Sequence, residues 1–294
     1  MPRFKNFDKI DKNIPVLIAG QTASGKSQIA IDIAKKQGRI IINADAIQVF
    51  KNWRILTARP SSVDEAKVNH KLYGHIDGNT DYSVGTWIKE VKEILSNNSR
   101  PIIVGGTGLY FSALTNGLVD IPEISASIRQ EANNRIKKNG FESLVGEIDQ
   151  ETVQKIDKNN PMRVQRAWEV LRSTGRSLSS WHQETPNPTL DLRMCKTILV
   201  DAEVSLINSR IVKRFDQMIE KGLIQEAKNN IASWNSLSPS SKAIGSHELI
   251  AYLNKEISKE QLREKIVFAT RQYAKRQRTW FRGKMQSWER YSVK

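Results

Sequence analysis

The stretch Gly20-Gln21-Thr22-Ala23-Ser24-Gly25-Lys26-Ser27 decides the fold of this 294-residue chain, because it fits the pattern G-x-x-x-x-G-K-[ST] at every fixed position. An apolar run at 14–19 precedes it, and apolar residues at helical spacing follow at 27–36. A strand, a glycine-rich loop and a helix in this order predict a phosphate-binding loop. Its N–H groups, helix N-terminus and Lys26 would hold two or more linked phosphates, with the Ser27 hydroxyl on a Mg²⁺ ion.

Further buried strands are predicted at 39–44, at 101–104 and at 196–201, with an amphipathic helix that begins at Ser83 and ends at 97–99. This order indicates an α/β fold in which helices flank a parallel sheet. Asp45 follows the second strand, and the turn Gly105-Gly106-Thr107-Gly108 follows the third. Because chemistry gathers at the carboxyl ends of parallel strands, Asp45 could bind metal or accept a proton; the alternative is an Asp that caps the next turn.

The remaining segments divide the chain into two predicted domains. Residues 118–190 show helical patterns and no buried strand, so we expect a helical insertion in an α/β core formed by 1–117 and 191–294. Asn160 and Pro161 predict the start of one of its helices. Residues 50–78 are expected to be irregular, with Arg54, Arg59 and Lys67 exposed and with His70 and His75 as loop residues rather than metal ligands.

Composition favours a globular, cytoplasmic protein with a polyanionic partner. Apolar residues make up 39% of the chain and charged residues 26%, and the formal net charge is +15. Cys195 is the only cysteine, which fits a reducing compartment. No run approaches the roughly twenty apolar residues of a membrane span. Met1 to Asn13 is charged without an apolar centre, so we expect no secretory signal there.

The C-terminal segment is strongly basic, since no Asp or Glu occurs between Lys265 and Trp288. Four basic residues share one helical face at positions i, +4, +7 and +11, namely Arg271, Lys275, Arg278 and Arg282. Interleaved aromatic residues could stack on unpaired bases, although some would be core residues: Tyr273, Trp280, Phe281 and Trp288. The pattern favours nucleic-acid binding over a solvated face. Earlier in the chain, Arg210 and Arg214 lie one turn apart, which suits a phosphate or an ordinary surface.

Several of the motifs described above occur in the same order in one family, so the sequence resembles the tRNA dimethylallyltransferases, also called tRNA isopentenyltransferases. The similarity runs from about residue 14 to 282, and its most specific stretch is Ala-Thr-Arg-Gln-Tyr-Ala-Lys-Arg-Gln-Arg-Thr-Trp at 269–280. The other matching stretches are 20–27, 43–50, 57–60, 82–84, 104–110, 160–163, 166–170 and 210–215. Four positions depart from common family residues: Ala46 replaces Ser, Phe50 replaces Tyr, Leu56 replaces Gly and Ser246 replaces Tyr.

The resemblance implies transfer of a dimethylallyl group from dimethylallyl diphosphate to N6 of the adenine 3′-adjacent to the anticodon in tRNA, with release of diphosphate. Asp45 matches the general base. The residues implied for the diphosphate are Lys26, Arg214, Thr107 and the loop itself, with Mg²⁺ on Ser27. The resemblance further implies that the adenine leaves its stack to be modified.

The resemblance also carries tRNA contacts to specific positions, and it makes the helical insertion the part that grips the anticodon stem–loop. The expected contacts are Asp45, Ala46, Ile47, Gln48, Thr107, Arg129, Met162, Arg163, Val164, Gln165, Arg166, Lys242, Ala243, Ile244, Gly245, Ser246, His247, Arg271, Lys275, Arg276, Gln277, Arg278, Thr279, Trp280, Phe281 and Arg282. We expect tRNA and dimethylallyl diphosphate as partners, no membrane, and a monomer.

Three other functions share some of these features. An enzyme that prenylates free AMP or ADP would not need the long cationic stripe. A small-molecule P-loop kinase that uses ATP would leave the basic C-terminal segment and the insertion unexplained. An RNA-binding protein that switches on ATP would give Asp45 and Thr107 no role.

Overall fold

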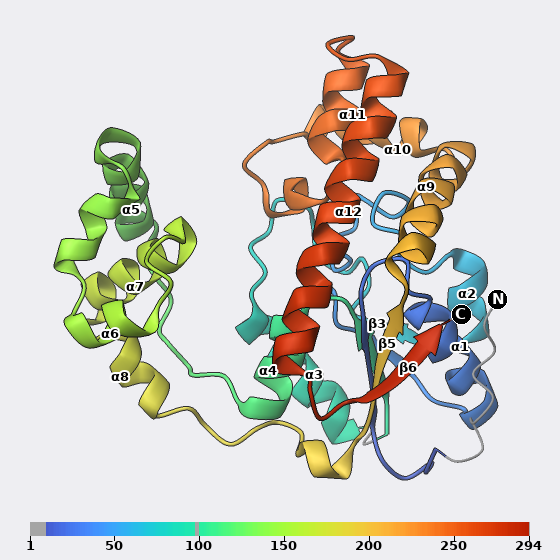
Figure 1. Cartoon of the computed structure of the whole chain (residues 1–294), viewed down its shortest axis with the longest axis horizontal. Helices are drawn as coiled ribbons and strands as arrows, with labels where there is room; N and C mark the ends of the chain where they lie inside the picture. The colour runs from blue at the N-terminus through green and yellow to red at the C-terminus, as the bar shows by residue number, and fades with distance from the viewer. Residues whose placement is uncertain (1–9, 98–99, 294) are drawn as a thin grey trace. The chain divides into compact units, whose positions relative to one another are not determined.

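The computed structural model describes residues 10–97 and 100–293, and it contains one six-stranded sheet in which every neighbouring pair is parallel. The strand order is β3-β2-β4-β1-β5-β6 (Figure 1). The strands are β1 Val16–Gly20, β2 Ile41–Asn43, β3 His70–Lys71, β4 Ile102–Gly105, β5 Lys196–Ala202 and β6 Glu289–Val293. The predicted α/β class with a parallel sheet is confirmed.

The centre of the sheet places the glycine-rich loop. All five residues of β1 are buried, and Val16 pairs with Ile102 of β4 on one side and with Lys196 of β5 on the other. Because all strands run the same way, the residues that follow β1, β2 and β4 emerge at one edge of the sheet. That edge therefore brings together the loop after β1, Asp45 after β2 and the Gly105 turn after β4.

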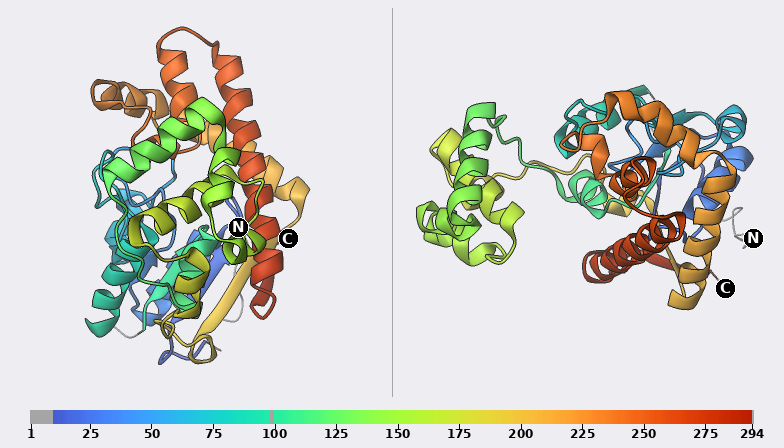
Figure 2. Two further views of the ribbon diagram at one scale, coloured as in Figure 1. Left: turned by 90° about the vertical axis from the view of Figure 1, so that its left-hand side faces the viewer. Right: turned by 90° about the horizontal axis from the view of Figure 1, so that it is seen from above.

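The α/β unit covers Met1–Thr115 and Thr189–Lys294. Its core joins residues of β1, β4 and β5 to residues of α1, α9 and α12, and α12 also packs against α11 (Figures 1 and 2). None of the described helices is both long enough and apolar enough to cross a membrane. The helices with a core or site position are α1 Lys26–Gln37, α3 Val84–Asn97, α4 Gly108–Asn116, α9 Val204–Glu220, α10 Leu223–Asn230, α11 Ser246–Leu253 and α12 Lys259–Lys284.

The helical unit, Asn116–Pro188, has its own core. Its α-helices are α5 Ala126–Asn139, α6 Gln150–Lys155, α7 Pro161–Thr174 and α8 Leu178–Gln183, and a 3-10 helix spans Phe141–Glu147. Asn160 caps α7 by accepting the Arg163 N–H, and Trp168 is 1% exposed at the centre of this unit.

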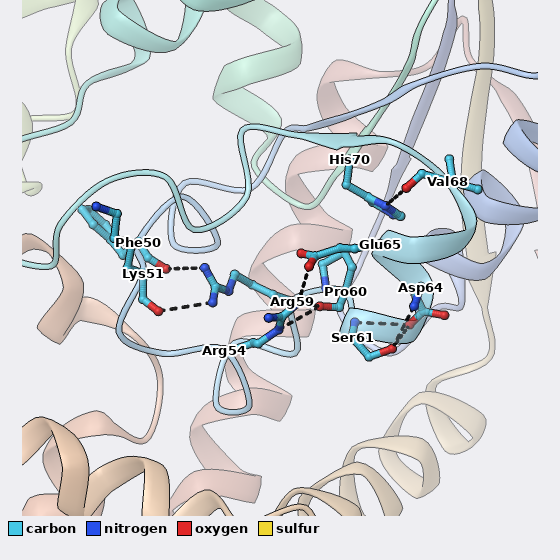
Figure 3. A network of polar contacts seen from close by, with 10 residues as sticks. All are labelled: Phe50, Lys51, Arg54, Arg59, Pro60, Ser61, Asp64, Glu65, Val68 and His70. Carbon is cyan, nitrogen blue, oxygen red and sulfur yellow. Dashed lines mark hydrogen bonds and ion pairs between the residues drawn. The ribbon is translucent and has the colours of Figure 1, made fainter.

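The structure differs from the sequence-based predictions at three points. Residues 50–78 are not wholly irregular, because a capping box at Ser61 starts the short helix α2, Ser62–Lys67, and β3 pairs with β2. Such short elements lack room for a periodic pattern. Arg54 and Arg59 are half-buried rather than exposed, since their guanidinium groups donate to backbone carbonyls (Figure 3). The edge strand β6 is not predicted from the sequence at all.

Some expectations fall on residues outside the described ranges. They are part of the N-terminal segment used to argue against a secretory signal, 1–9, and the last two residues of the predicted helix end, 98–99.

Candidate active site

The loop after β1 is held in shape by hydrogen bonds to two distant segments. Gly25 adopts φ 93° and lies directly before α1, so the loop ends at the N-terminus of that helix. Arg210 Nη1 donates to the carbonyls of Ala23 (3.4 Å) and Ser24 (3.2 Å). The N–H of Thr22 donates to Gln277 Oε1 at 2.8 Å. The loop is therefore preformed, which reduces the cost of binding an anion.

Two cations face the loop. Lys26 Nζ lies 3.4 Å from the Gln21 carbonyl, and Arg214 Nη1 donates to Thr22 Oγ1 at 3.1 Å. Desolvation lowers the pKa of Lys26 to about 8, while Asp45 raises it and Arg214 lowers it further. Desolvation also lowers the pKa of Arg214 from its usual value, and Asp45 acts against this. The strain of two neighbouring cations in a desolvated site would be relieved by a bound polyanion.

Gly105 explains how Asp45 and Thr107 come together. A Cβ at Gly105 would lie 1.9 Å from the Ala44 carbonyl oxygen, so only glycine lets β4 approach the end of β2 this closely. At this crossing the Thr107 N–H donates to the Ala44 carbonyl (3.1 Å), and the Ala46 N–H donates to Thr107 Oγ1 (3.0 Å). These two hydrogen bonds go to the residues on either side of Asp45, so they hold Thr107 next to it.

Asp45 has one oxygen engaged and one open. Its Oδ1 accepts the N–H groups of Ile47 (3.0 Å) and Gln48 (3.4 Å), so the side chain does cap the turn that follows. No hydrogen bond in the described part of the chain reaches Oδ2, which lies 3.5 Å from the position of a Cβ at Gly106. The capping and proton-accepting interpretations are therefore compatible, because they use different oxygens.

Asp45 interacts electrostatically with three tyrosines and with two cations. Burial raises the pKa of Tyr73, Tyr110 and Tyr273, and the charge of Asp45 raises each of them further. These tyrosines remain neutral at physiological pH; Tyr110 is 3% exposed and stacks on Trp87, while Tyr73 and Tyr273 are half-buried. The charge of Asp45 thus acts on three tyrosines and on both cations near the loop.

Gln277, an expected tRNA contact, has a structural role that the sequence does not predict. It is 6% exposed, and its Nε2 donates to the Gly106 carbonyl at 2.8 Å while its Oε1 accepts the Thr22 N–H. It therefore fastens the turn after β4 to the loop after β1. The available signal is helical phase, since Gln277 shares the buried face of α12 with Ala274 and Phe281.

Several other expected tRNA contacts are buried in this structure. Ser246 Oγ donates to the Ser241 carbonyl at 2.6 Å, and Phe281 is 3% exposed within the core. Trp288 is also core, packed edge-on against Phe111. The buried members of the expected set are Val164, Ala243, Gly245, Ser246, Gln277 and Phe281. Their tRNA contact stays a prediction, and in this structure they pack within the protein.

The remaining expected contacts are exposed or half-exposed on their own units. In the α/β unit these are Asp45, Ala46, Ile47, Gln48, Thr107, Lys242, Ile244, His247, Arg271, Lys275, Arg276, Arg278, Thr279, Trp280 and Arg282. In the helical unit, Met162 is 72% exposed at the start of α7. Its other members with some exposure are Arg129, Arg163, Gln165 and Arg166. Two departures from the family pattern, Phe50 and Leu56, are core residues.

A divalent cation would find one protein ligand at this edge. Ser27 lies exposed in the first turn of α1. Within the described ranges, no group of three or more His, Cys, Asp or Glu side chains could hold a metal ion. This donor set fits Mg²⁺, which usually keeps several waters and binds through substrate phosphates.

The comparisons with known proteins agree along nearly the whole chain. The sequence model of the IPP transferase family matches residues 48–284, and that of the isopentenyl transferase family matches residues 14–77. A protein of Ruegeria sp. named tRNA dimethylallyltransferase is 49% identical over 98% of each chain. One of the same name from Dinoroseobacter shibae is 50% identical over 93% of each chain.

Solved structures show the same fold. The tRNA isopentenylpyrophosphate transferase of Bacillus halodurans aligns with a TM-score of 0.67 at 29% identity, covering 96% of this chain and 90% of that one. A eukaryotic dimethylallyltransferase acting on tRNA aligns with a TM-score of 0.80 at 24% identity, covering 95% and 73%. By its sequence along nearly its full length, this chain belongs to the IPP transferase family of tRNA dimethylallyltransferases.

Proposed function

We propose that this protein transfers a dimethylallyl group from dimethylallyl diphosphate to N6 of the adenine 3′-adjacent to the anticodon in tRNA. The observation that carries the proposal is the position of Asp45, whose Oδ2 is open at the strand edge that also holds the phosphate loop. Nearby, α12 carries the acid-free cationic face expected of an RNA-binding surface.

The loop side of the site would bind the diphosphate as a leaving group. When the allylic carbon–oxygen bond breaks, negative charge grows on the diphosphate. Lys26, Arg214 and the N–H groups at the start of α1 are fixed donors for that charge. A bound Mg²⁺ would add positive charge at the phosphates next to Ser27.

The Asp45 side would handle the nucleophile. The adenine amino group forms the new carbon–nitrogen bond at the allylic carbon, and the proton that it loses goes to Asp45 Oδ2. An exocyclic amino group is a weak nucleophile, so proton removal and close positioning both contribute to the rate. Tyr73 and Tyr273 are half-buried neutral rings on which the charge of this carboxylate acts, and an adenine moved out of its stack would pack against them. This reaction needs only one chain and a cytoplasmic supply of tRNA, so we propose a cytoplasmic monomer.

The test is incubation with labelled dimethylallyl diphosphate and Mg²⁺, with tRNA, AMP, ADP or ATP supplied in separate reactions. We expect label in tRNA alone, and digestion of the product should give N6-dimethylallyl-adenosine. Label in AMP or ADP would instead support prenylation of free nucleotides. Phosphate transfer from ATP to a small molecule would support a kinase.

The assay should also include Asp45→Ala, with tRNA binding measured in parallel. We expect transfer to be abolished while tRNA is still bound. Turnover close to that of the wild-type protein would refute the role of Asp45 as the base.

A further inference from the structure

One backbone carbonyl connects the two sides of the site. The Thr57 carbonyl accepts hydrogen bonds from Gln48 Nε2 at 2.8 Å and from Arg214 Nη2 at 3.3 Å. Gln48 belongs to the turn held by Asp45 Oδ1, and Arg214 also donates to Thr22 in the phosphate loop. Moving Thr57 would therefore displace a residue on the nucleophile side and a cation on the diphosphate side together.

The segment that carries this carbonyl, residues 52–58, has no regular secondary structure to fix it. Ala58 has a positive φ of 49°, which is unfavourable for a residue other than glycine. Such a conformation persists only where surrounding contacts hold it. Turn hydrogen bonds within the segment, such as Ala58 N–H to the Ile55 carbonyl (3.0 Å), hold it locally, and side chains outside the segment add further contacts.

Glu226 of α10 is the anchor that acts closest to Thr57. Its Oε1 accepts the Ile55 N–H at 2.7 Å, and its Oε2 accepts the Leu56 N–H at 2.9 Å. Asn230, one turn later on α10, donates to the Asn52 carbonyl at 2.7 Å. Arg59 completes the frame, with Nη1 on the Phe50 carbonyl (3.0 Å) and Nη2 on the Lys51 carbonyl (3.2 Å) (Figure 3).

The Glu226 carboxylate is partly buried and has more hydrogen-bond partners than a surface glutamate usually has. Burial raises the pKa of Glu226, while the backbone N–H donors and the Arg59 guanidinium act in the opposite direction. Both carboxylate oxygens are engaged by consecutive backbone N–H groups, and hydrogen bonds to an ionised acceptor are about twice as strong as neutral ones. A partly desolvated charge is thus used to set the path of one loop.

We propose that Glu226 is a positioning residue of the transfer reaction, which holds the Thr57 carbonyl where Gln48 and Arg214 both donate to it. This inference rests on the proposed function for its kinetic part. Its structural part, the hold on Arg214, concerns diphosphate binding alone and does not depend on the identity of the prenyl acceptor.

The first experiment compares Glu226→Gln with the wild-type protein, and Glu220→Gln serves as the control. The glutamine can accept only one of the two N–H groups, and its own amide hydrogens would face the other. We expect the affinity for inorganic diphosphate to fall about tenfold, as for loss of one charge-assisted hydrogen bond. Glu220 is exposed at the end of α9, so its variant should bind as the wild-type protein does.

A double-mutant cycle separates positioning from general stability. In transfer assays, Glu226→Gln should raise KM for both tRNA and dimethylallyl diphosphate and lower kcat. Combined with Gln48→Ala, it should cost less in KM for tRNA than it does alone, because the group through which it acts is already gone. Additive effects, or a lower melting temperature with unchanged kinetics and diphosphate affinity, would overturn the proposal.

A second variant covers the case in which Glu226→Gln does not fold. Glu226→Asp keeps the charge but shortens the reach, so we expect an intermediate loss of diphosphate affinity; unchanged affinity would overturn the positioning role. If the wild-type protein binds diphosphate but modifies no tRNA, the proposed function fails while the binding arm still decides the role of Glu226.

Discussion

The strand edge that holds Asp45 and the exposed face of α12 differ in whether their charged side chains have partners within the protein. At the strand edge, Lys26, Arg214 and one oxygen of Asp45 all have protein partners at defined distances. On α12, the basic side chains Arg271, Lys275 and Arg282 are exposed, and none has an ion pair within the described ranges.

The difference follows from what each region has to bind. Charge that develops during bond breaking is best stabilised by donors that are already fixed, because no reorganisation is then needed. Binding to a phosphate backbone depends on net charge and on release of counterions, for which solvated, mobile side chains suffice. Substitutions in the first region should therefore act on rate or diphosphate affinity, and those in the second on RNA affinity and its salt dependence.

The largest effect is expected from Asp45→Asn. The amide oxygen can still accept the Ile47 and Gln48 N–H groups, so the turn should persist while the proton acceptor is lost. We expect kcat to fall by about 10² to 10⁴, with little change in tRNA affinity, measured by single-turnover kinetics and by filter binding. A comparable loss of tRNA binding would show that Asp45 acts mainly as a capping residue.

The next effect is a pH dependence of diphosphate binding that comes from Lys26. Its pKa is lowered from 10.5 to about 8, so the free protein loses this ammonium charge as the pH rises through 8. Affinity for dimethylallyl diphosphate should therefore decrease between pH 7 and 9.5, as measured by titration calorimetry. Lys26→Arg should remove most of this decrease, because a guanidinium stays charged over the whole range. The same decrease in both proteins would assign the effect to another group.

The same lowered pKa has a consequence for folding. A buried ammonium is less favourable in the folded state than in the unfolded chain, so Lys26 opposes folding below pH 8. That cost should diminish as the pH rises from 8 towards 10.5.

How much of this could be predicted depends on the range of the interactions. The phosphate loop, the strands and the position of Asp45 follow from local patterns, because apolar runs and a fixed glycine spacing specify them. The hydrogen bond from the Thr22 N–H to Gln277 Oε1 joins residues 255 positions apart, and no local pattern encodes such a contact. The elements α2 and β3 are short, and β6, although as long as β1, has only one buried residue, Val293, and so lacks the apolar run that marks the central strands.

The candidate site likewise combines features that local sequence patterns predict with contacts that they do not. The spacing of Arg210 and Arg214 predicts that they share a face, but it leaves open whether that face meets solvent or the phosphate loop. The cationic stripe on α12 is evident from the sequence, yet the same stretch contains Gln277 and Phe281, which are buried. A basic motif therefore mixes residues that present charge with residues that hold the helix in place.

A moderate effect is expected from Gln277→Leu, which tests whether α12 also supports the rigid region. The Thr22 N–H and the Gly106 carbonyl would both lose their buried partner, at a cost of about 1–3 kcal/mol each. We expect a lower melting temperature and a roughly tenfold loss of diphosphate affinity. Gln272→Leu, at an exposed position of the same helix, is the matched control and should change neither property. An unchanged affinity in Gln277→Leu would mean that the loop holds its shape without α12.

The smallest effect is expected from Arg278→Ala on the cationic stripe, and its salt dependence matters more than its size. Each phosphate contact contributes about 0.7 to 0.9 to the slope of log affinity against log salt. Arg278→Ala should therefore weaken tRNA binding several-fold at low salt and reduce that slope by about one contact, while diphosphate affinity stays unchanged.

Lys92→Ala provides the control for charge alone, because Lys92 is exposed on α3 and lies outside the stripe. If both variants lower tRNA affinity equally and leave the slope alone, the stripe contributes only to the general positive field of the protein. A lower slope in Arg278→Ala alone would place a phosphate at the stripe. The two regions would then be distinguished by measurement, since one variant class changes diphosphate affinity without the salt slope and the other does the reverse.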